Sequence, residues 1–144
     1  MLSRLLLSII ATISLAHAGT SLRIEHPRKP SYQKDLYSIV CQKECVLEIK
    51  SNEPGKGLSK PDVFESKIKE LVNLEETNML PKSDNVLRRL LYTIEADDGK
   101  RKLKLVLGYP TSYKGEEYKK YVSVISRIEE LKLTMSLEMQ GTER

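Results

Sequence analysis

The stretch that decides the fold is LLYTIEADDGKRKLKLVL, residues 90–107. Its middle holds Asp98-Gly99, a dipeptide favoured in two-residue hairpin turns because their central residues need positive φ. Counting outward from this turn pairs Ile94 with Leu103, and it places acidic residues opposite lysines on the other face. Turn chemistry and side-chain pairing therefore agree, and the stretch predicts a β-hairpin with one apolar face.

Residues 36–50, LYSIVCQKECVLEIK, predict a second hairpin. If Cys41 faces Cys45 across a three-residue turn, Ile39 pairs with Leu47. All four side chains then share one face, because side chains alternate along a strand. Three-residue turns usually contain a glycine in the left-handed conformation, and this one has none.

Two segments have the spacing of amphipathic helices. The first is predicted from Pro61 to about Glu76, because proline suits the first turn and apolar residues recur at helical spacing. The second begins at Glu116, with acidic residues where the helix dipole favours them. Residues 131–139 then alternate between apolar and polar side chains, with no turn residue before them. The missing turn residue would suit a continued helix, but the alternation favours a short final strand.

These segments define the fold class as α+β, with two hairpins each followed by a helix (ββ-α-ββ-α). We expect one domain over residues 36–144, an antiparallel sheet with both helices on one face, because that arrangement buries both helical stripes. Residues 51–60 contain Pro and Gly and predict a loop. Residues 19–35 predict a polar arm, in which Leu22 and Ile24 alternate with charged neighbours as in a short edge strand.

Residues 1–18 have the pattern of a cleavable secretory signal peptide. Arg4 precedes an apolar run that ends in Ala16-His17-Ala18, where small residues flank His17 in the A-x-A arrangement that precedes cleavage after Ala18. The run is shorter than the ~20 residues that span a bilayer. We therefore expect export to the periplasm or beyond the cell, without stable membrane insertion after cleavage.

Cys41 and Cys45 are the only two cysteines. The oxidising compartment of an exported protein favours a structural disulfide between them. Redox exchange is an alternative, although the usual C-x-x-C spacing at a helix N-terminus is missing. A metal site would need more ligands, and His26 is the single histidine after residue 18. We expect no metal and no cofactor.

The sequence offers little for catalysis. A Ser-His-Asp triad or a Cys-His pair would have to use His26, which lies in the polar arm and is predicted to be solvated. No phosphate-binding loop, HExxH or GxGxxG motif occurs. Adjacent carboxylates could support acid–base chemistry, but each pair also suits a turn or a helix end. These pairs are Glu75-Glu76, Asp97-Asp98, Glu116-Glu117 and Glu129-Glu130.

The candidate contact residues are two tyrosines and two lysines. Tyr109 and Tyr113 flank a proline in a predicted loop, where exposed tyrosines often contribute to protein binding. Lys102 and Lys104 share the exposed face of the predicted hairpin, where an anionic partner could dock. A guard against edge-to-edge aggregation is the alternative role for these lysines. The net charge of +4 is mixed along the chain, so we expect no nucleic-acid partner.

These observations together favour an exported, non-enzymatic binding protein whose partner is another exported protein. An inhibitor or immunity protein that occludes a hydrolase is the first hypothesis. The second is an envelope accessory or assembly factor that binds exported proteins through an exposed sheet edge. The third is a small hydrolase that uses carboxylates.

Overall fold

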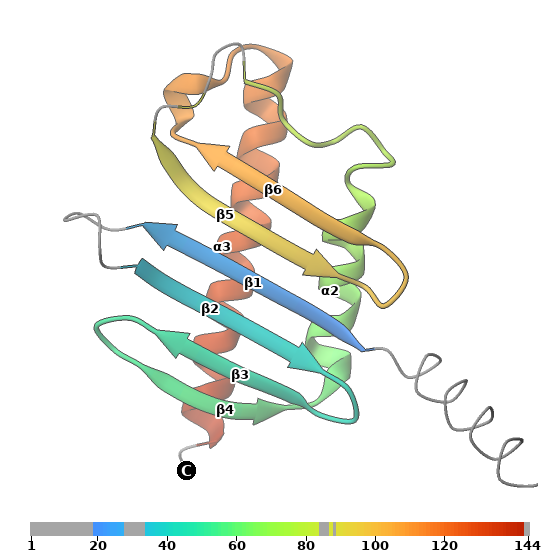
Figure 1. The fold of residues 1–144 in the computed structure, drawn as a ribbon, viewed down its shortest axis with the longest axis vertical. Coiled ribbons are helices and arrows are strands. Elements are labelled where there is room, and N and C mark those ends of the chain that lie inside the picture. Colours follow the sequence, from blue (N-terminus) through green and yellow to red (C-terminus); the bar gives the residue numbers. More distant parts are fainter. Residues whose placement is uncertain (1–18, 28–33, 84–86, 88, 143–144) are drawn as a thin grey trace, which may run out of the picture.

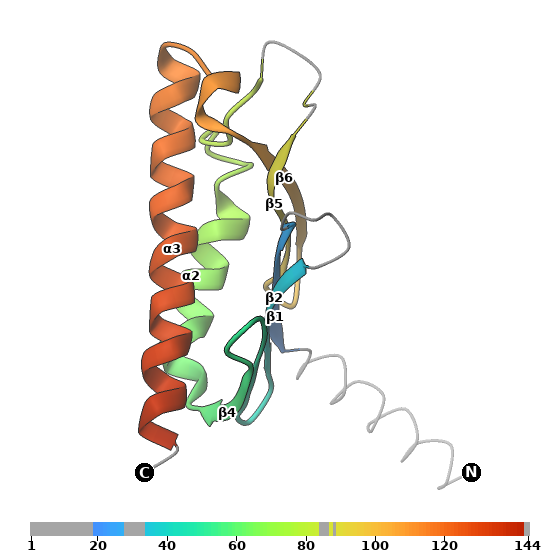
Figure 2. The same ribbon diagram turned by 90° about the vertical axis from the view of Figure 1, so that its left-hand side faces the viewer.

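The computed structural model describes residues 19–27, 34–83, 87 and 89–142, and it shows an α+β domain. Its antiparallel sheet has six strands in the order β4-β3-β2-β1-β5-β6 (Figure 1). Both helices lie against the same face of this sheet, as predicted (Figure 2). In the described part of the chain, no helix covers the other face.

The strands are β1 (Thr20–Pro27), β2 (Lys34–Cys41), β3 (Cys45–Lys50), β4 (Gly55–Ser59), β5 (Leu90–Asp97) and β6 (Lys102–Gly108). The helices are α2 (Pro61–Asn73), the 3-10 turn η1 (Pro110–Ser112) and α3 (Glu116–Thr142).

Strands β2 and β3 form the predicted hairpin in the predicted register. Cys41 pairs with Cys45, and Ile39 pairs with Leu47. All four side chains have no solvent exposure, because their shared face is the one that the helices cover. The hairpin and the register that the alternation of apolar residues predicted are therefore both confirmed.

Strands β5 and β6 also form a hairpin, but the predicted register is wrong by two residues. Ile94 pairs with Leu105 rather than with Leu103. A shift of two leaves every side chain on its predicted face, whereas a shift of one would have exchanged the faces. The apolar face of the hairpin therefore still packs against the helices.

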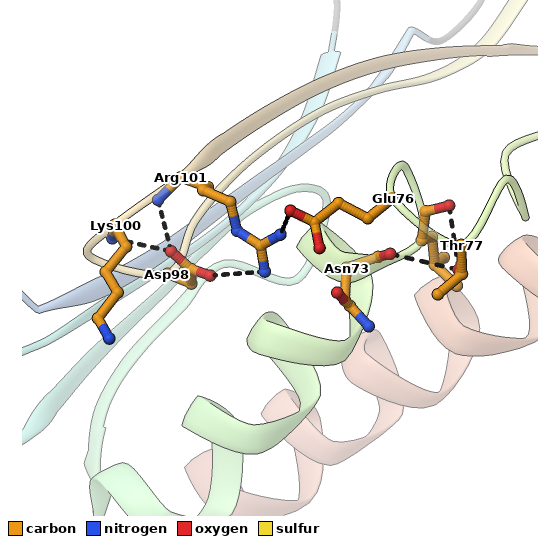
Figure 3. Close-up of polar contacts among 7 residues, drawn as sticks. Asn73, Glu76, Thr77, Asp98, Lys100 and Arg101 are labelled. Atoms are coloured by element: carbon orange, nitrogen blue, oxygen red, sulfur yellow. Dashed lines mark hydrogen bonds and ion pairs between the residues drawn. The ribbon is translucent and has the colours of Figure 1, made fainter.

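The register differs because the loop between β5 and β6 spans residues 98–101. The Asp98 carboxylate accepts hydrogen bonds from the backbone N–H groups of Lys100 and Arg101, at 2.8 and 2.6 Å (Figure 3). The Arg101 guanidinium also pairs with Glu76, which follows α2. These contacts stabilise a longer loop than the Asp98-Gly99 dipeptide alone predicts.

Strand β1 lies between β2 and β5, so the strand predicted in residues 19–35 is central and not at an edge. Leu22 and Ile24 face the helices and are 2% and 0% exposed. Strands β2 and β5 pair with the backbone N–H and C=O groups on both sides of β1. A short apolar pattern is therefore enough to hold β1 in the sheet.

Residues 51–60 are not only a loop, because Gly55–Ser59 forms β4 at one end of the sheet. Its glycines have weak strand propensity, and the strand depends on its pairing with β3 and its packing against α3. A Cβ atom added to Gly55 would lie 3.4 Å from the sulfur of Met139. An added methyl group would therefore make an ordinary van der Waals contact with α3, which packs against this strand.

The short final strand predicted for residues 131–139 is wrong, because α3 continues through them. Met135 and Met139 are 0% and 6% exposed on the sheet side of the helix. Leu133 and Leu137 are 61% and 58% exposed on the opposite side. Apolar residues on two sides of a helix produce the alternation that resembles a strand.

The core lies between the helices and the sheet, where both predicted helical stripes are buried. Helix α2 begins at Pro61 as predicted and ends at Asn73, about one turn before the predicted end. The helices contribute Phe64, Ile68, Leu71, Val72, Tyr121, Val124, Ile128 and Leu131 to this core.

The predicted signal peptide, residues 1–18, lies outside the described residues. Within the part of the chain that the structure describes, no helix is long and apolar enough to cross a membrane.

Candidate functional site

A disulfide joins Cys41 and Cys45 across the β2–β3 hairpin, with 3.9 Å between the Cα atoms. Both cysteines are 0% exposed and face the helices. Thiol exchange needs an accessible sulfur, so this burial fits a structural bridge better than a redox site. Among the described residues, no group of three or more His, Cys, Asp or Glu side chains is placed to hold a metal ion.

The outer face of the sheet, turned away from the helices, carries its side chains in rows that cross the strands. Three half-exposed aliphatic residues are neighbours in one row: Leu58, Val46 and Val40, at 51%, 51% and 50% exposure. Single exposed aliphatic residues are ordinary, whereas adjacent ones form the kind of patch found at protein contacts. We call these three residues the aliphatic row.

The next row on the same face carries charges of alternating sign. From β4 to β6 it contains Lys56, Glu48, Ser38, Arg23, Glu95 and Lys104. Glu48 lies 3.9 Å from Lys56, and Arg23 pairs with Glu25 of its own strand at 2.8 Å. Opposite charges on neighbouring strands stabilise the register of the sheet.

A depression of about 520 Å³ lies in the outer face. Ser21 and Ser38 line it with short side chains from the central strands β1 and β2. Val40 of the aliphatic row also lines it, and Lys102 and Lys104 line it from β6. Glu95 and Asp97 line it as well, so the depression connects an apolar surface with one that carries charges of both signs.

Lys102 and Lys104 are both exposed, as predicted, and they lie on β6, a terminal strand of the sheet. They stand opposite Asp97 and Glu95 in the register. Even so, within the described ranges neither ammonium group lies within 4.0 Å of a carboxylate. Their place on an edge strand agrees with the predicted alternative role as guards against aggregation.

The two candidate tyrosines differ in exposure. Tyr109 is 40% exposed, as expected of a contact residue. Tyr113 is only 5% exposed, and its ring stacks on Tyr121 with 4.3 Å between the centroids. Its hydroxyl accepts a hydrogen bond from the Gly108 N–H at 3.0 Å. The prediction of an exposed Tyr113 is wrong, because the chain turns through η1 and directs this ring into the core.

Tyr121, on α3, also binds the backbone of Gly108. Its hydroxyl donates a hydrogen bond of 2.8 Å to the Gly108 carbonyl, and burial raises the pKa of Tyr121 to about 12. Its predicted place on the buried stripe is confirmed, with 3% exposure.

A polar cluster that the sequence analysis missed lies between the sheet and α3. The Tyr92 hydroxyl donates to the Glu129 carboxylate and accepts a hydrogen bond of 2.9 Å from the Lys132 ammonium. That ammonium lies 5.0 Å from the ring centroid of Tyr37 and 5.1 Å from that of Tyr92. Burial, together with the hydrogen bond to Glu129, raises the pKa of Tyr92 well above its ordinary value. The spacing of Glu129 and Lys132 was visible in the sequence, but their aromatic partners lie on distant strands.

His26 borders this cluster and is half-buried, so its prediction as a solvated residue is wrong. Its ring centroid lies 5.2 Å from that of Tyr92, and its Nδ1 lies 2.7 Å from the Leu91 carbonyl oxygen. A carbonyl only accepts hydrogen bonds, so we assign the proton to Nδ1. His26 thus links β1 to β5.

Each adjacent carboxylate pair has a member with a structural contact. Asp98 closes the β5–β6 loop, and Glu129 belongs to the polar cluster. Glu117 accepts a hydrogen bond of 2.6 Å from the Lys82 backbone N–H, which lowers its pKa. Glu130 pairs with Lys67 of α2 at 2.7 Å, and Glu76 pairs with Arg101.

Comparison of the sequence with protein-family models and with curated proteins found no match. We therefore infer the function from the exposure, contacts and charges of the residues themselves.

Proposed function

We propose that this chain is an exported, non-enzymatic binding protein that contacts another exported protein through the outer face of its sheet. The observation that supports this most is the aliphatic row. Leu58, Val46 and Val40 are each half exposed on three adjacent strands, and Val40 borders the depression. Burying such a patch against a partner removes apolar surface from water and stabilises a complex.

The proposed partner is a hydrolase that the protein inhibits, in the manner of an inhibitor or an immunity protein. The aliphatic row lies on strands held in a fixed register, and the disulfide closes the hairpin that carries Val40 and Val46. A surface that is ordered before binding loses little conformational entropy on association. Such a surface suits tight, stoichiometric occlusion of an enzyme.

An envelope accessory factor is the second candidate, and the open ends of the sheet support it. Strands β4 and β6 each pair with a single strand within the described part of the chain. Unpaired strand edges can accept a strand from another protein.

The proposal is tested by titrating the protein into exported hydrolases of the same organism. We expect one enzyme to be inhibited at equimolar ratio by the wild-type protein. The Val46→Glu variant should inhibit it at least ~10-fold more weakly, which corresponds to about 1.4 kcal/mol. The matched control is Leu137→Glu, which adds the same charge at a comparably exposed aliphatic residue on α3 and should inhibit normally. Circular dichroism of both variants verifies their folding.

Unchanged inhibition by Val46→Glu would overturn the proposed surface. If none of the exported hydrolases forms a stoichiometric complex, the proposed function as an inhibitor is wrong.

A further inference from the structure

We infer that the partner adds an acidic β-strand to the free edge of β6, with carboxylates beside Lys102 and Lys104. This inference rests on the proposed function, and it specifies the chemistry of the partner.

The edge of β6 is suited to strand addition. Of the two terminal strands, β6 is the longer, at 7 residues against 5 for β4. Helix α3 also packs closely on β4, where the Ser59 hydroxyl donates to Glu138 at 3.1 Å. Among the described residues, β6 therefore offers the longer row of backbone groups with no strand on one side, and such a row is a template for a further strand.

The charges of the outer face indicate what the added strand carries. Their sign alternates along one row, from Arg23 on β1 to Glu95 on β5 and Lys104 on β6. A seventh strand continues this alternation if its residue beside Lys104 is acidic. Lys102 lies on the same face, and neither lysine has a carboxylate within 4.0 Å among the described residues. Val106, 39% exposed, follows on that face and favours an apolar neighbour.

The structure also has space for the inner face of an added strand. A cavity of about 380 Å³ lies where the chain leaves α2 and β6 begins, lined by Val72, Glu75, Glu76, Arg101 and Lys102. A side chain that points toward the helices can enter this cavity. The edge thus accepts a strand with acidic residues at two alternate positions and an apolar residue at the third.

The same lysines argue against a second copy of this chain as the occupant. In an antiparallel β6–β6 pair centred on these residues, lysines would lie opposite lysines, and like charges destabilise cross-strand pairs. The positive charge of this edge repels basic strands and attracts acidic ones. The same charge therefore explains both the protection against edge-to-edge aggregation and the proposed recognition.

The test uses the isotope-labelled full chain and two synthetic peptides at millimolar concentration. The first is Thr-Glu-Thr-Glu-Thr-Val-Thr, and the second has lysine in place of both glutamates. We expect the acidic peptide to shift the backbone amide resonances of residues 102–108 and to slow their hydrogen exchange. The lysine peptide should do neither. In the Lys102→Glu/Lys104→Glu variant this preference should reverse.

Equal effects of the two peptides, or shifts without slower exchange, would overturn strand addition. The hydrolase titration distinguishes this inference from the proposed function. The Lys102→Glu/Lys104→Glu variant should weaken inhibition at least ~10-fold. The matched reversal Lys114→Glu/Lys119→Glu, at exposed lysines before and within the first turn of α3 and away from the outer face, should have little effect. If Val46→Glu abolishes inhibition and the β6 variant does not, the strand-addition inference fails while the proposed function stands.

Discussion

The Tyr92 hydroxyl donates a hydrogen bond to the Glu129 carboxylate and so joins a strand of the sheet to the middle of α3. The Lys132 ammonium completes this arrangement by donating to the same hydroxyl. The contact lies at a half-buried position, where a lost partner is costly because water replaces it poorly.

Replacing Tyr92 with Phe is expected to lower the free energy of unfolding by about 1–2 kcal/mol. The change removes the hydrogen bond to Glu129, which keeps its ion pair with Lys132 at 3.6 Å. Hydrogen bonds to charged groups contribute about 1.5–3 kcal/mol, and the solvent exposure of Glu129 lowers this value. Urea denaturation measures the loss. The matched control is Tyr118→Phe, at a 45% exposed ring, with an expected change under about 0.5 kcal/mol. Equal losses in the two variants would show that the polar cluster adds nothing to stability.

Asp98→Ala is expected to destabilise the protein in a pH-dependent way. Burial raises the pKa of Asp98, but hydrogen bonds from the Arg101 and Lys100 backbone, with the Arg101 charge, outweigh it and hold the pKa below its ordinary value. The ionised carboxylate therefore stabilises the folded state above pH ~4, and this contribution disappears as pH falls through the lowered pKa. Urea denaturation should show a difference of about 1–2 kcal/mol at pH 7 that shrinks toward pH ~2. A difference independent of pH would contradict this account.

Two substitutions in α3 test its helical periodicity. Met135→Ala removes a fully buried side chain and should cost about 2–4 kcal/mol. Leu137→Glu lies on the solvent side and should change stability by less than about 0.5 kcal/mol. In a strand these two residues would share one face, so similar costs for both variants in thermal or urea unfolding would refute the helix.

The two tyrosines around η1 are expected to differ in their contribution to stability, because Tyr113 is buried and Tyr109 is at the surface. Tyr113→Ala removes a buried ring that stacks on Tyr121 and should cost about 3 kcal/mol or more. Tyr109→Ala should leave the unfolding free energy within about 0.5 kcal/mol of the wild-type value. Thermal unfolding monitored by circular dichroism compares the two variants, and a larger loss for Tyr109→Ala would reverse the assignment.

The disulfide is expected to resist reagents until the protein unfolds, because Cys41 and Cys45 are fully buried. Reduction should increase the mass by two hydrogen atoms, and it should be much faster in denaturant than in buffer. Replacing both cysteines with alanine should cost about 2 kcal/mol, the chain-entropy value for so short a loop. Two alkylatable thiols in protein prepared from an oxidising compartment would contradict the bridge.

Local patterns predicted the parts of the fold that local chemistry decides. The pairing of Cys41 with Cys45 followed from alternation on both sides of the turn. The register of Ile94 did not, because Asp98 accepts hydrogen bonds from two backbone N–H groups and lengthens the loop. Since the error was an even number of residues, the buried face of that hairpin was still predicted correctly.

Other elements depend on neighbours that a single sequence does not reveal. Strand β4 has almost no strand propensity and forms because β3 and α3 hold it. The exposed residues Leu133 and Leu137 gave a helical segment the alternating pattern of a strand. At the candidate site, the exposure of Lys102 and Lys104 was predicted from alternation, whereas the burial of Tyr113 depends on the direction of η1.

The contact between Gly55 and Met139 has a consequence for the order in which the chain can fold. Strand β4 can pair with β3 early, but its packing against α3 waits for residues far along the sequence, such as Glu138, which accepts a hydrogen bond from Ser59. A nascent chain that lacks this part of α3 leaves the inner side of β4 uncovered and cannot reach the final packing. We therefore expect the ribosome-bound chain to stay incompletely folded until the last turns of α3 have left the ribosome.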